Sequence, residues 1–371
     1  MIHYILLFIL QFLHFTNITK ATRLECFGFF SGNYLRFNWT TVTTVVPTTL
    51  DIATDFSPNG TYYTLTKHAH VHNARVAVFA AAIRPKYPLP LNGSHPTEQA
   101  AWISRAVQIV QQYNLDGINF DYEEPLNATD YRNEGYVRLV NQTRIALLKM
   151  YQTNKQKATM VPQVSVDVGW SSDHIDGRFY NGLGLAAASD YLYVMGYDLR
   201  SQYSKSTAGN CLAGANAALS NVRKGLINWI NLGVPSSKLI LGVPWYGFAY
   251  TCVKEVTDKC IVNSVPFRGS PCSDAAGGEV PFVGILPLLK DINTTRKWDG
   301  VSSTPYLAIM NGDNLRREIW YDDVESLTLK MALVKELGLG GGGPYEFSDL
   351  DYMDEKSTKE MWDTLVVLNE N

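Results

Sequence analysis

The chain lacks the features that mark several large classes of protein. Its 32 Lys and Arg residues against 35 Asp and Glu give a formal net charge of −3, and no basic stripe suited to a nucleic acid appears. It contains no HExxH zinc motif, no Gly-Lys-Ser/Thr phosphate loop and no catalytic-serine motif. Beyond the N-terminus, no segment reaches the roughly 18 uninterrupted apolar residues of a membrane helix. We therefore expect no nucleic-acid partner, and no membrane span once the N-terminal segment is removed.

The first 20 residues predict a secretory signal peptide. Residues 4–15 are apolar apart from Gln11 and His14, a run too short for a bilayer and suited to the core of a signal peptide. A buried N-terminal strand is the alternative. We expect cleavage between Phe15 and Leu24, which leaves residues 24–371 as the mature, glycosylated protein, lysosomal or secreted. The N-glycosylation sequons begin at Asn17, Asn38, Asn59, Asn92, Asn127, Asn141 and Asn293.

Cysteine is scarce, with five residues in the chain. An odd number leaves at least one thiol unpaired within the chain. Cys252, Cys260 and Cys272 lie close together, and an oxidising compartment would permit a disulfide among them. The pairing of these three with Cys26 and Cys211 stays open.

Length alone allows one large α/β barrel or two mid-sized domains, but the pattern along the chain favours the barrel. Helical periodicity over residues 97–113, 130–156 and 324–337 alternates with short apolar runs typical of buried parallel strands. We predict an α/β fold, a (β/α)8 TIM barrel whose chemistry lies at the C-terminal ends of the strands. The eight predicted strands are Cys26–Phe30, Val42–Val46, Val76–Ala82, Gly117–Asp121, Gln163–Val168, Tyr191–Met195, Leu239–Val243 and Gly340–Tyr345.

The seventh and eighth predicted strands are about a hundred residues apart. Residues 251–305 hold three cysteines with several prolines and glycines. We predict that this stretch is a small, loop-rich, cysteine-containing subdomain inserted over one side of the barrel mouth.

The most informative stretch is residues 115–125, LDGINFDYEEP. Side chains alternate along a strand, so Asn119, Asp121 and Glu123 share one face at intervals of roughly 6–7 Å. Carboxyls facing a barrel interior are costly unless they are paired or hydrogen-bonded. Two of them on one face repel when both are ionised, which favours a neutral acid beside an ionised partner. Such an acid can protonate a leaving group.

This stretch resembles the DxxDxDxE signature of glycoside hydrolase family 18, the chitinase family. Asp116, Asp121 and Glu123 match three of its acidic positions, and Asn119 stands where Asp is usual, which resembles the di-N-acetylchitobiase branch. Further matches follow in the family's order. They are VDVGWSS around Asp167, YVMGYD at 193–198, LGVPWYGFAYTC at 241–252, VPFRGSPCSDA at 265–275 and WYDD at 320–323.

The resemblance implies a substrate-assisted mechanism that needs no metal and no cofactor. Glu123 would protonate the glycosidic oxygen while the substrate's own 2-acetamido oxygen attacks the anomeric carbon. Asp121 would hydrogen-bond the acetamido N–H, and Tyr197 would hold its oxygen. Glu123 would then activate water, with net retention. Asp116 has the opposite strand parity and is interpreted as a buried hydrogen-bonding support.

The resemblance also suggests substrate-binding residues. Asp198 matches a position that contacts sugar hydroxyls. Trp245 and Tyr246 are candidates for lining the site, and the alternative is that one of them packs in the core. Arg268 is a candidate from the insertion. Trp170 fits either the site or the core, and core packing is slightly preferred. Most family members end the eighth strand with a Trp beneath the reacting sugar, and here Tyr345 takes that place after the glycines of residues 340–343.

Three alternating histidines, His68, His70 and His72, form a separate pattern. On a strand they would face one way and resemble a metal site. We expect instead the exposed end of a helix preceding the third strand, with no metal.

We expect a hydrolase whose substrate is an oligosaccharide containing N-acetylglucosamine, and a monomer. The first hypothesis is an exo-acting chitobiase-type enzyme for the GlcNAc-β-1,4-GlcNAc core of N-linked glycans or for small chitooligosaccharides. The alternatives are an endochitinase on longer chitin and a non-catalytic, chitinase-like lectin. Retention of Glu123 argues against the lectin.

Overall fold

The computed structural model describes residues 23–49, 61–81, 89–92, 95–153, 160–201, 209–292, 294–310 and 315–369. The predicted signal peptide and the sequons at Asn17, Asn59 and Asn293 lie outside these residues. Of the other sequons, Asn127 and Asn141 are exposed.

Eight parallel strands close into a barrel in the order β1-β16-β8-β6-β5-β4-β3-β2. All eight strands predicted from the apolar runs are present. Two have the predicted ends, and the ends of the others are shifted by at most two residues. Their interiors are buried, as expected for parallel strands covered on both faces. The predicted fold class is confirmed. The strands are β1 (Glu25–Phe30), β2 (Thr44–Pro47), β3 (Arg75–Ala81), β4 (Gly117–Asp121), β5 (Gln163–Gly169), β6 (Tyr191–Met195), β8 (Leu239–Pro244) and β16 (Gly341–Tyr345).

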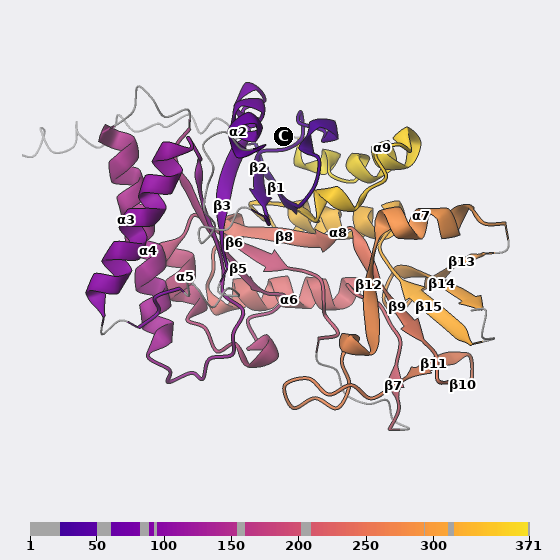
Figure 1. Cartoon of the computed structure of the whole chain (residues 1–371). Coiled ribbons are helices and arrows are strands. Elements are labelled where there is room, and N and C mark those ends of the chain that lie inside the picture. The colour runs from indigo at the N-terminus through magenta and orange to yellow at the C-terminus, as the bar shows by residue number, and fades with distance from the viewer. Residues whose placement is uncertain are drawn as a thin grey trace, which may run out of the picture.

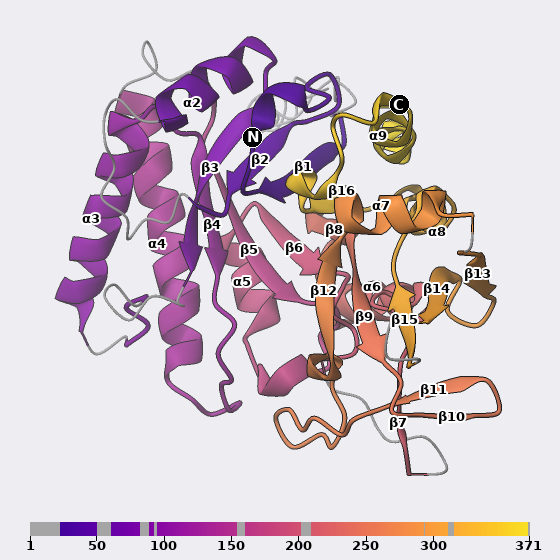
Figure 2. The ribbon, with the colours of Figure 1, turned by 45° about the vertical axis from the view of Figure 1, so that its right-hand side comes forward.

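Helices surround the barrel, and α3 and α4 lie together on the side opposite the insertion (Figures 1 and 2). The three helical segments predicted from periodicity are α3, α4 and α8, and α8 begins with a capping box at Asp323. None of the helices within the described ranges is long and apolar enough to cross a membrane. The helices are α2 (Thr61–Val71), α3 (Pro96–Gln112), α4 (Arg132–Thr153), α5 (Gly182–Ala188), α6 (Leu219–Leu232), α7 (Phe282–Lys290), α8 (Val324–Glu336) and α9 (Glu355–Asp363).

The three histidines lie at the end of α2, before β3, as predicted, but the expectation that they are exposed is wrong. His68 packs against Trp39, with ring centroids 5.1 Å apart. His70 Nε2 lies 2.7 Å from Asp116 Oδ2. The helix turns these side chains toward the barrel wall, so they serve packing and hydrogen bonding there.

The glycine run of β16 forms the seam where the last barrel strand meets the first. A Cβ on Gly341 would lie 2.0 Å from the carbonyl oxygen of Glu25, and one on Gly343 would lie 2.0 Å from that of Phe27. Only residues without a side chain permit this close approach of β16 to β1. The unusual composition therefore has a structural reason at the barrel seam.

The segment between β8 and β16 is more regular and longer than predicted. It forms a five-stranded antiparallel sheet in the order β12-β9-β15-β14-β13, with α7 beside it (Figure 2). The sheet extends from Tyr246 to Trp320, beyond the predicted limits of 251 and 305, because its first strand follows β8 directly. The strands are β9 (Tyr246–Thr251), β12 (Gly277–Pro281), β13 (Arg296–Asp299), β14 (Thr304–Met310) and β15 (Arg316–Trp320).

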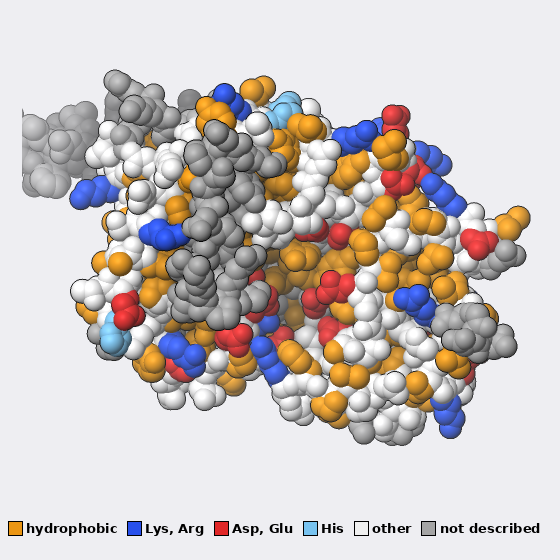
Figure 3. Space-filling model, in the orientation of Figure 1, with side chains coloured by type: hydrophobic (Ala, Val, Ile, Leu, Met, Phe, Trp, Pro, Cys, Tyr) orange, Lys and Arg blue, Asp and Glu red, His pale blue; other side chains and the backbone are white. Residues whose placement is uncertain are grey.

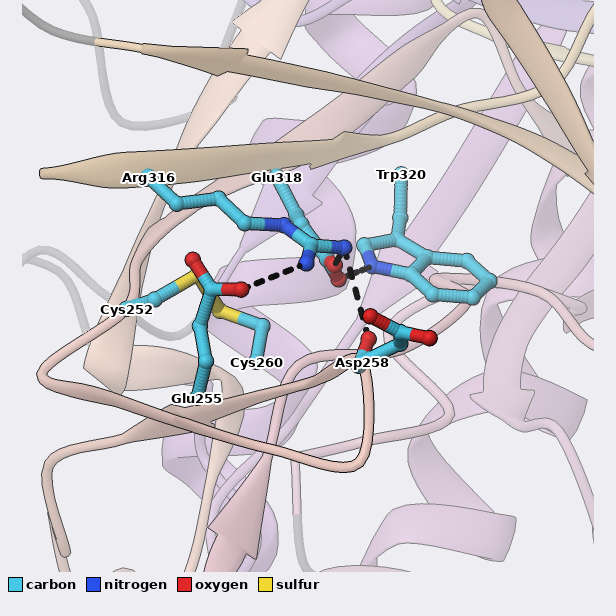
Figure 4. Close-up of a disulfide and its surroundings, with 7 residues drawn as sticks. All are labelled: Cys252, Glu255, Asp258, Cys260, Arg316, Glu318 and Trp320. Atoms are coloured by element: carbon cyan, nitrogen blue, oxygen red, sulfur yellow. Dashed lines mark hydrogen bonds and ion pairs between the residues drawn. A yellow bond between two sulfur atoms is a disulfide. The ribbon is translucent and has the colours of Figure 1, made fainter.

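A second small sheet joins the insertion to the chain that follows β6. It consists of β10 (Lys254–Val256), β11 (Lys259–Val262) and β7 (Cys211–Leu212). The disulfide expected within the cysteine-rich segment is Cys252–Cys260 (Figure 4), and Cys211–Cys272 ties β7 to the insertion. Cys26 is the unpaired, buried cysteine.

Ion pairs hold the β10–β11 hairpin beside the disulfide (Figure 4). Arg316 Nη1 lies 3.0 Å from Glu255 Oε2, and its Nη2 lies 2.5 Å from Glu318 Oε1. Trp320 Nε1 donates to the other oxygen of Glu318 at 2.9 Å. The antiparallel sheet is thereby fixed to the hairpin by covalent and charged contacts.

Candidate active site

The β4 strand carries the central carboxyls, as its alternation predicts. Asn119 and Asp121 face the barrel interior and are 0% and 7% exposed. Glu123 follows the strand end and its side chain is 36% exposed. Asp121 and Glu123 are joined by a side-chain hydrogen bond. One buried and one accessible carboxyl therefore lie together at the C-terminal mouth of the barrel.

Glu123 opens onto a cavity of about 350 Å³. The space-filling view shows a hollow in this face with Asp and Glu side chains around it (Figure 3). The walls come from the ends of β4, β5 and β6 and from the insertion. The lining residues are Glu123, Gly169, Trp170, Ile175, Asp176, Arg178, Met195, Tyr197, Asp198, Ser201, Phe248, Phe267, Asp274, Ala275 and Glu279.

Burial governs the protonation of the inner carboxyls. The pKa of Asp121 is raised well above its ordinary value, first by burial and then by the charge of Glu123. Asp167 on β5 behaves in the same way, and its first cause is again burial, followed by the charge of Asp121. Asn119 Nδ2 donates to Asp167 Oδ1 at 2.8 Å and to Ser165 Oγ at 3.0 Å. Within the described residues, Asp121 Oδ1 is buried and has no hydrogen-bond partner.

A cluster of tyrosines lies beside the cavity, and Tyr197 is its member that lines the cavity. Tyr197 follows β6, and its ring lies 5.4 Å from that of Tyr345 and 6.1 Å from that of Tyr246. Tyr246 Oη donates to Asp198 Oδ1 at 2.5 Å. Burial raises the pKa of Asp198 to about 7, while the hydrogen bond from Tyr246 opposes this rise. Tyr345 ends β16, so its aromatic face lies with the other tyrosines at the barrel mouth.

Several residues proposed from the sequence do not line this cavity. Asn119 and Asp121 lie on β4 inside the barrel, and Tyr246 and Tyr345 line a separate pocket. Three more lie elsewhere. Trp245 lies in the bend between β8 and β9, is 1% exposed and packs edge-on against Phe347 and Trp362. Asp116 precedes β4, where its Oδ2 accepts from the backbone N–H of Val76 at 3.0 Å and contacts His70.

The third of them, Arg268, ties the insertion to two barrel loops. Its Nη1 donates to the carbonyl oxygen of Asp176 at 2.8 Å, and its Nη2 donates to that of Glu123 at 3.3 Å. Arg268 therefore supports the cavity from outside. Trp170, in contrast, is half-buried and does line the cavity.

Sequence reasoning missed several groups in the cavity wall. Arg178 Nη2 lies 2.6 Å from Glu123 Oε2, and the side chain comes from the loop after β5. Asp274 and Glu279 come from the insertion. Asp167, within the VDVGWSS match, does not line the cavity but lies beside it and accepts from Asn119. A single charged residue in a loop has no periodicity that would assign it to a site.

The composition of the cavity suits an uncharged, hydroxyl-rich molecule. No group of three or more His, Cys, Asp or Glu side chains able to hold a metal ion occurs in the described parts of the chain. Aromatic faces combined with carboxyl and hydroxyl groups provide both apolar contact and hydrogen bonds.

A paired acid and buried carboxyl at the mouth of a (β/α)8 barrel define a glycoside hydrolase. The sequence pattern of "Glycosyl hydrolases family 18" matches residues 79–349, so the chain belongs to that family and is an enzyme of the chitobiase and chitinase type. It is similar to the di-N-acetylchitobiase of Mus musculus, with 36% identity over 303 residues, 80% of this chain and 78% of that one. The Homo sapiens di-N-acetylchitobiase is 34% identical over 275 residues, 73% of this chain and 68% of that one.

A solved structure agrees on the fold. The GH18 chitinase from Cycas revoluta in complex with (GlcNAc)3 superposes with a TM-score of 0.71 at 20% identity, covering 92% of this chain and 99% of that one.

Proposed function

We propose that this protein hydrolyses the GlcNAc-β-1,4-GlcNAc bond with retention, using the substrate's 2-acetamido group as the nucleophile. The observation that carries the proposal is the Asp121–Glu123 pair, in which one carboxyl is buried and the other opens onto the cavity. The similarity to two mammalian di-N-acetylchitobiases supports the choice of sugar.

In the first step Glu123 donates a proton to the glycosidic oxygen as the C1–O bond breaks. The acetamido oxygen attacks C1 and forms an oxazolinium ion. Asp121 Oδ1, buried and without a partner in the described structure, is suited to accept the acetamido N–H and to stabilise the positive charge. Tyr197 is suited to hold the acetamido oxygen from the cavity wall.

In the second step Glu123, now ionised, accepts a proton from water, which attacks C1 from the face that the leaving group left. The acetamido group is regenerated, and Glu123 is protonated again for the next cycle. Two inversions at C1 give net retention. One accessible acid and one buried carboxyl therefore suffice, and neither acts as a covalent nucleophile.

Exo action on short substrates is supported by the insertion. Arg268 bridges from the insertion to the backbone of Glu123 and Asp176, both of which line the cavity. The insertion also contributes Phe267, Asp274 and Glu279 to the lining and so forms one wall of the cavity. We infer that this wall limits the length of the bound substrate, whereas an endochitinase needs a groove that is open at both ends. We propose the chitobiose core of N-linked glycans or small chitooligosaccharides as substrates, in a lysosomal or extracellular setting that the two disulfides also fit.

The test compares the wild type with Glu123→Gln and with Glu124→Gln as the matched control. Glu124 is the exposed neighbour and does not line the cavity. Glu123→Gln should lose at least about 10²–10⁴-fold in kcat on chitobiose, and Glu124→Gln should remain near wild type. No turnover of chitobiose, chitohexaose or a core glycan with a free reducing end would reject the proposal. Mainly internal cleavage of chitohexaose would favour an endochitinase.

A further inference from the structure

Arg178 makes the most direct charged contact with Glu123 in the structure. Its Nη2 lies 2.6 Å from Glu123 Oε2 and 3.6 Å from Asp176 Oδ2. The Arg178 side chain is 12% exposed, so water screens this pair less than a surface ion pair. The guanidinium thus lies between two carboxylates, one of which is the proposed acid and base.

The position of Arg178 is fixed by backbone pairing between two loops. Leu126, just after the carboxyl pair, accepts from Phe179 at 3.0 Å and donates to Gly177 at 3.1 Å. Tyr180 Oη lies 2.9 Å from the carbonyl oxygen of Tyr122 and 2.6 Å from that of Glu124, and its single O–H is shared between them. Arg178 is therefore held next to Glu123 by the same contacts that join the β4 and β5 loops.

Asp176 gives the guanidinium a second partner. Its carboxyl is buried at 5% exposure, and its Oδ1 accepts from Ser201 Oγ at 2.8 Å. If the glycosidic oxygen of a substrate takes the place of Arg178 at Glu123, the guanidinium still has a counter-charge. Release of Glu123 then leaves no buried charge without a partner, which would otherwise be costly.

The remaining charges around Glu123 oppose one another. The carboxyls of Asp121, Asp167 and Asp198 interact electrostatically with Glu123. Arg268 donates to the backbone oxygen of Glu123. In the described structure, Arg178 is the cation in contact with the Glu123 carboxyl itself, at 2.6 Å.

We propose that Arg178 is a positioning residue that holds Glu123 ionised in the empty site, releases it toward substrate while remaining paired with Asp176, and so sets the pH range of the acid step. The inference rests on the proposed function, because the Arg178–Glu123 ion pair affects catalysis only if Glu123 has to be protonated to cleave the glycosidic bond. By stabilising the ionised carboxylate, Arg178 confines efficient proton donation to lower pH.

The pH profile of kcat/KM on chitobiose tests the proposal, since it reports on the free enzyme. In the Arg178→Gln variant, the fall of activity with rising pH should occur about one pH unit higher than in the wild type. Arg178→Lys keeps the charge and should leave this fall of activity near its wild-type position. Asp176→Asn removes the competing carboxylate and should move the fall of activity to lower pH.

Arg132→Gln is the matched control. Arg132 pairs with Asp130 at 2.7 Å outside the cavity, so its removal should leave the profile unchanged. Melting curves identify any variant that is unfolded. The proposal is overturned if the Arg178→Gln profile superimposes on that of the wild type, or if Arg132→Gln shifts it equally.

An infrared difference titration separates this inference from the proposed function. Subtracting the carboxyl band of Glu123→Gln from that of the wild type reports protonation of Glu123 without any turnover, and the same subtraction is made on the Arg178→Gln background. A shift of this titration without hydrolysis would reject the proposed function and retain the role of Arg178. Hydrolysis without a shift of the Glu123 titration would retain the proposed function and reject the role of Arg178.

Discussion

Two buried carboxyls, one in the barrel and one in the insertion, show what distinguishes a reactive group from a structural one. Asp121 is 7% exposed and Glu318 is 3% exposed. Asp121 has two further carboxyls near it, Glu123 and Asp167, and its pKa is raised. Glu318 instead receives Arg316 on one oxygen and Trp320 Nε1 on the other. Similar burial thus occurs in different surroundings, with carboxyls around Asp121 and with an arginine and an indole N–H around Glu318.

A third carboxyl lies at the junction of the two regions. Asp322 follows the last strand of the insertion and pairs with Lys330 of α8, and both side chains are 0% exposed. Burial raises the pKa of Asp322, while the charge of Lys330 opposes this rise. This pair resembles Glu318 in being compensated, although the second oxygen, Oδ2, has no hydrogen-bond partner in the described structure.

The sharpest test of the comparison exchanges each carboxyl for an amide. Asp121→Asn should lower kcat by about 10²–10³-fold, because a positioned group facing developing charge is lost. Its stability at neutral pH should be unchanged or higher, since a carboxyl that resists ionisation is removed. Glu318→Gln should keep kcat within about threefold while lowering stability by about 1–3 kcal/mol. Steady-state kinetics and chemical unfolding of both variants measure these effects. A similar loss of kcat in both would contradict the distinction between a reactive Asp121 and a structural Glu318.

The junction pair should give the largest effect on stability. Lys330→Met leaves Asp322 buried without its counter-charge and should cost about 3–5 kcal/mol in the free energy of unfolding. The double variant Asp322→Asn/Lys330→Met removes both charges and should recover most of that loss. Urea unfolding of the two measures the difference. If the double variant is no more stable than the single one, the cost comes from lost packing and not from charge.

The hairpin disulfide should matter less. Replacing Cys252 and Cys260 by Ser opens a loop with a sequence separation of 8, for which loop-closure entropy predicts a loss of about 2.5 kcal/mol. Activity on chitobiose should persist, because neither cysteine lines the cavity. Thermal unfolding beside the activity assay checks this. An inactive but folded variant would show that the hairpin contributes to the site.

The smallest effect concerns pH and Asp198. Its folded-state pKa of about 7 lies above the unfolded value, so between about pH 4 and pH 7 the folded protein binds more protons than the unfolded chain. Stability contributed by this group is therefore lost as pH rises through that window. Asp198→Asn should remove about 1–2 kcal/mol of this dependence, because Asp198 retains some exposure. Melting temperatures of the wild type and Asp198→Asn at about pH 5 and about pH 7.5 measure this pH dependence. An equal change of melting temperature with pH in both proteins would contradict the raised pKa of Asp198.

Most of the barrel could be predicted from the sequence because buried parallel strands are nearly continuous apolar runs. Gly117–Asp121 and Tyr191–Met195 were located to the residue. The alternation along β4 also placed Asn119 and Asp121 on one inward face. The insertion was harder, since its short antiparallel strands alternate and contain charges, as in Arg316–Trp320. Its regular sheet was therefore mistaken for loops.

The site could be predicted only where a strand carried it. Asp121 and Glu123 follow a period of two, but Arg178 comes from a loop whose path depends on pairing with Leu126. The adjacent residues Trp245 and Tyr246 also differ, since Tyr246 lies beside Tyr197 and Trp245 lies in the core. Their order in the sequence does not reveal this, because a bend at Trp245 separates β8 from β9.

The seam between β1 and β16 has a consequence for synthesis. The first barrel strand pairs with the last, and the register joins Glu25 to Gly341 and Cys26 to Gly342. The carboxyl-bearing strands β4 and β5 leave the ribosome long before residues 341–345 emerge. Until then the nascent barrel has two open edges, which can pair with other chains. The narrow glycine strand is thus the final piece of assembly, and a chain that stops before it would expose both edges to aggregation.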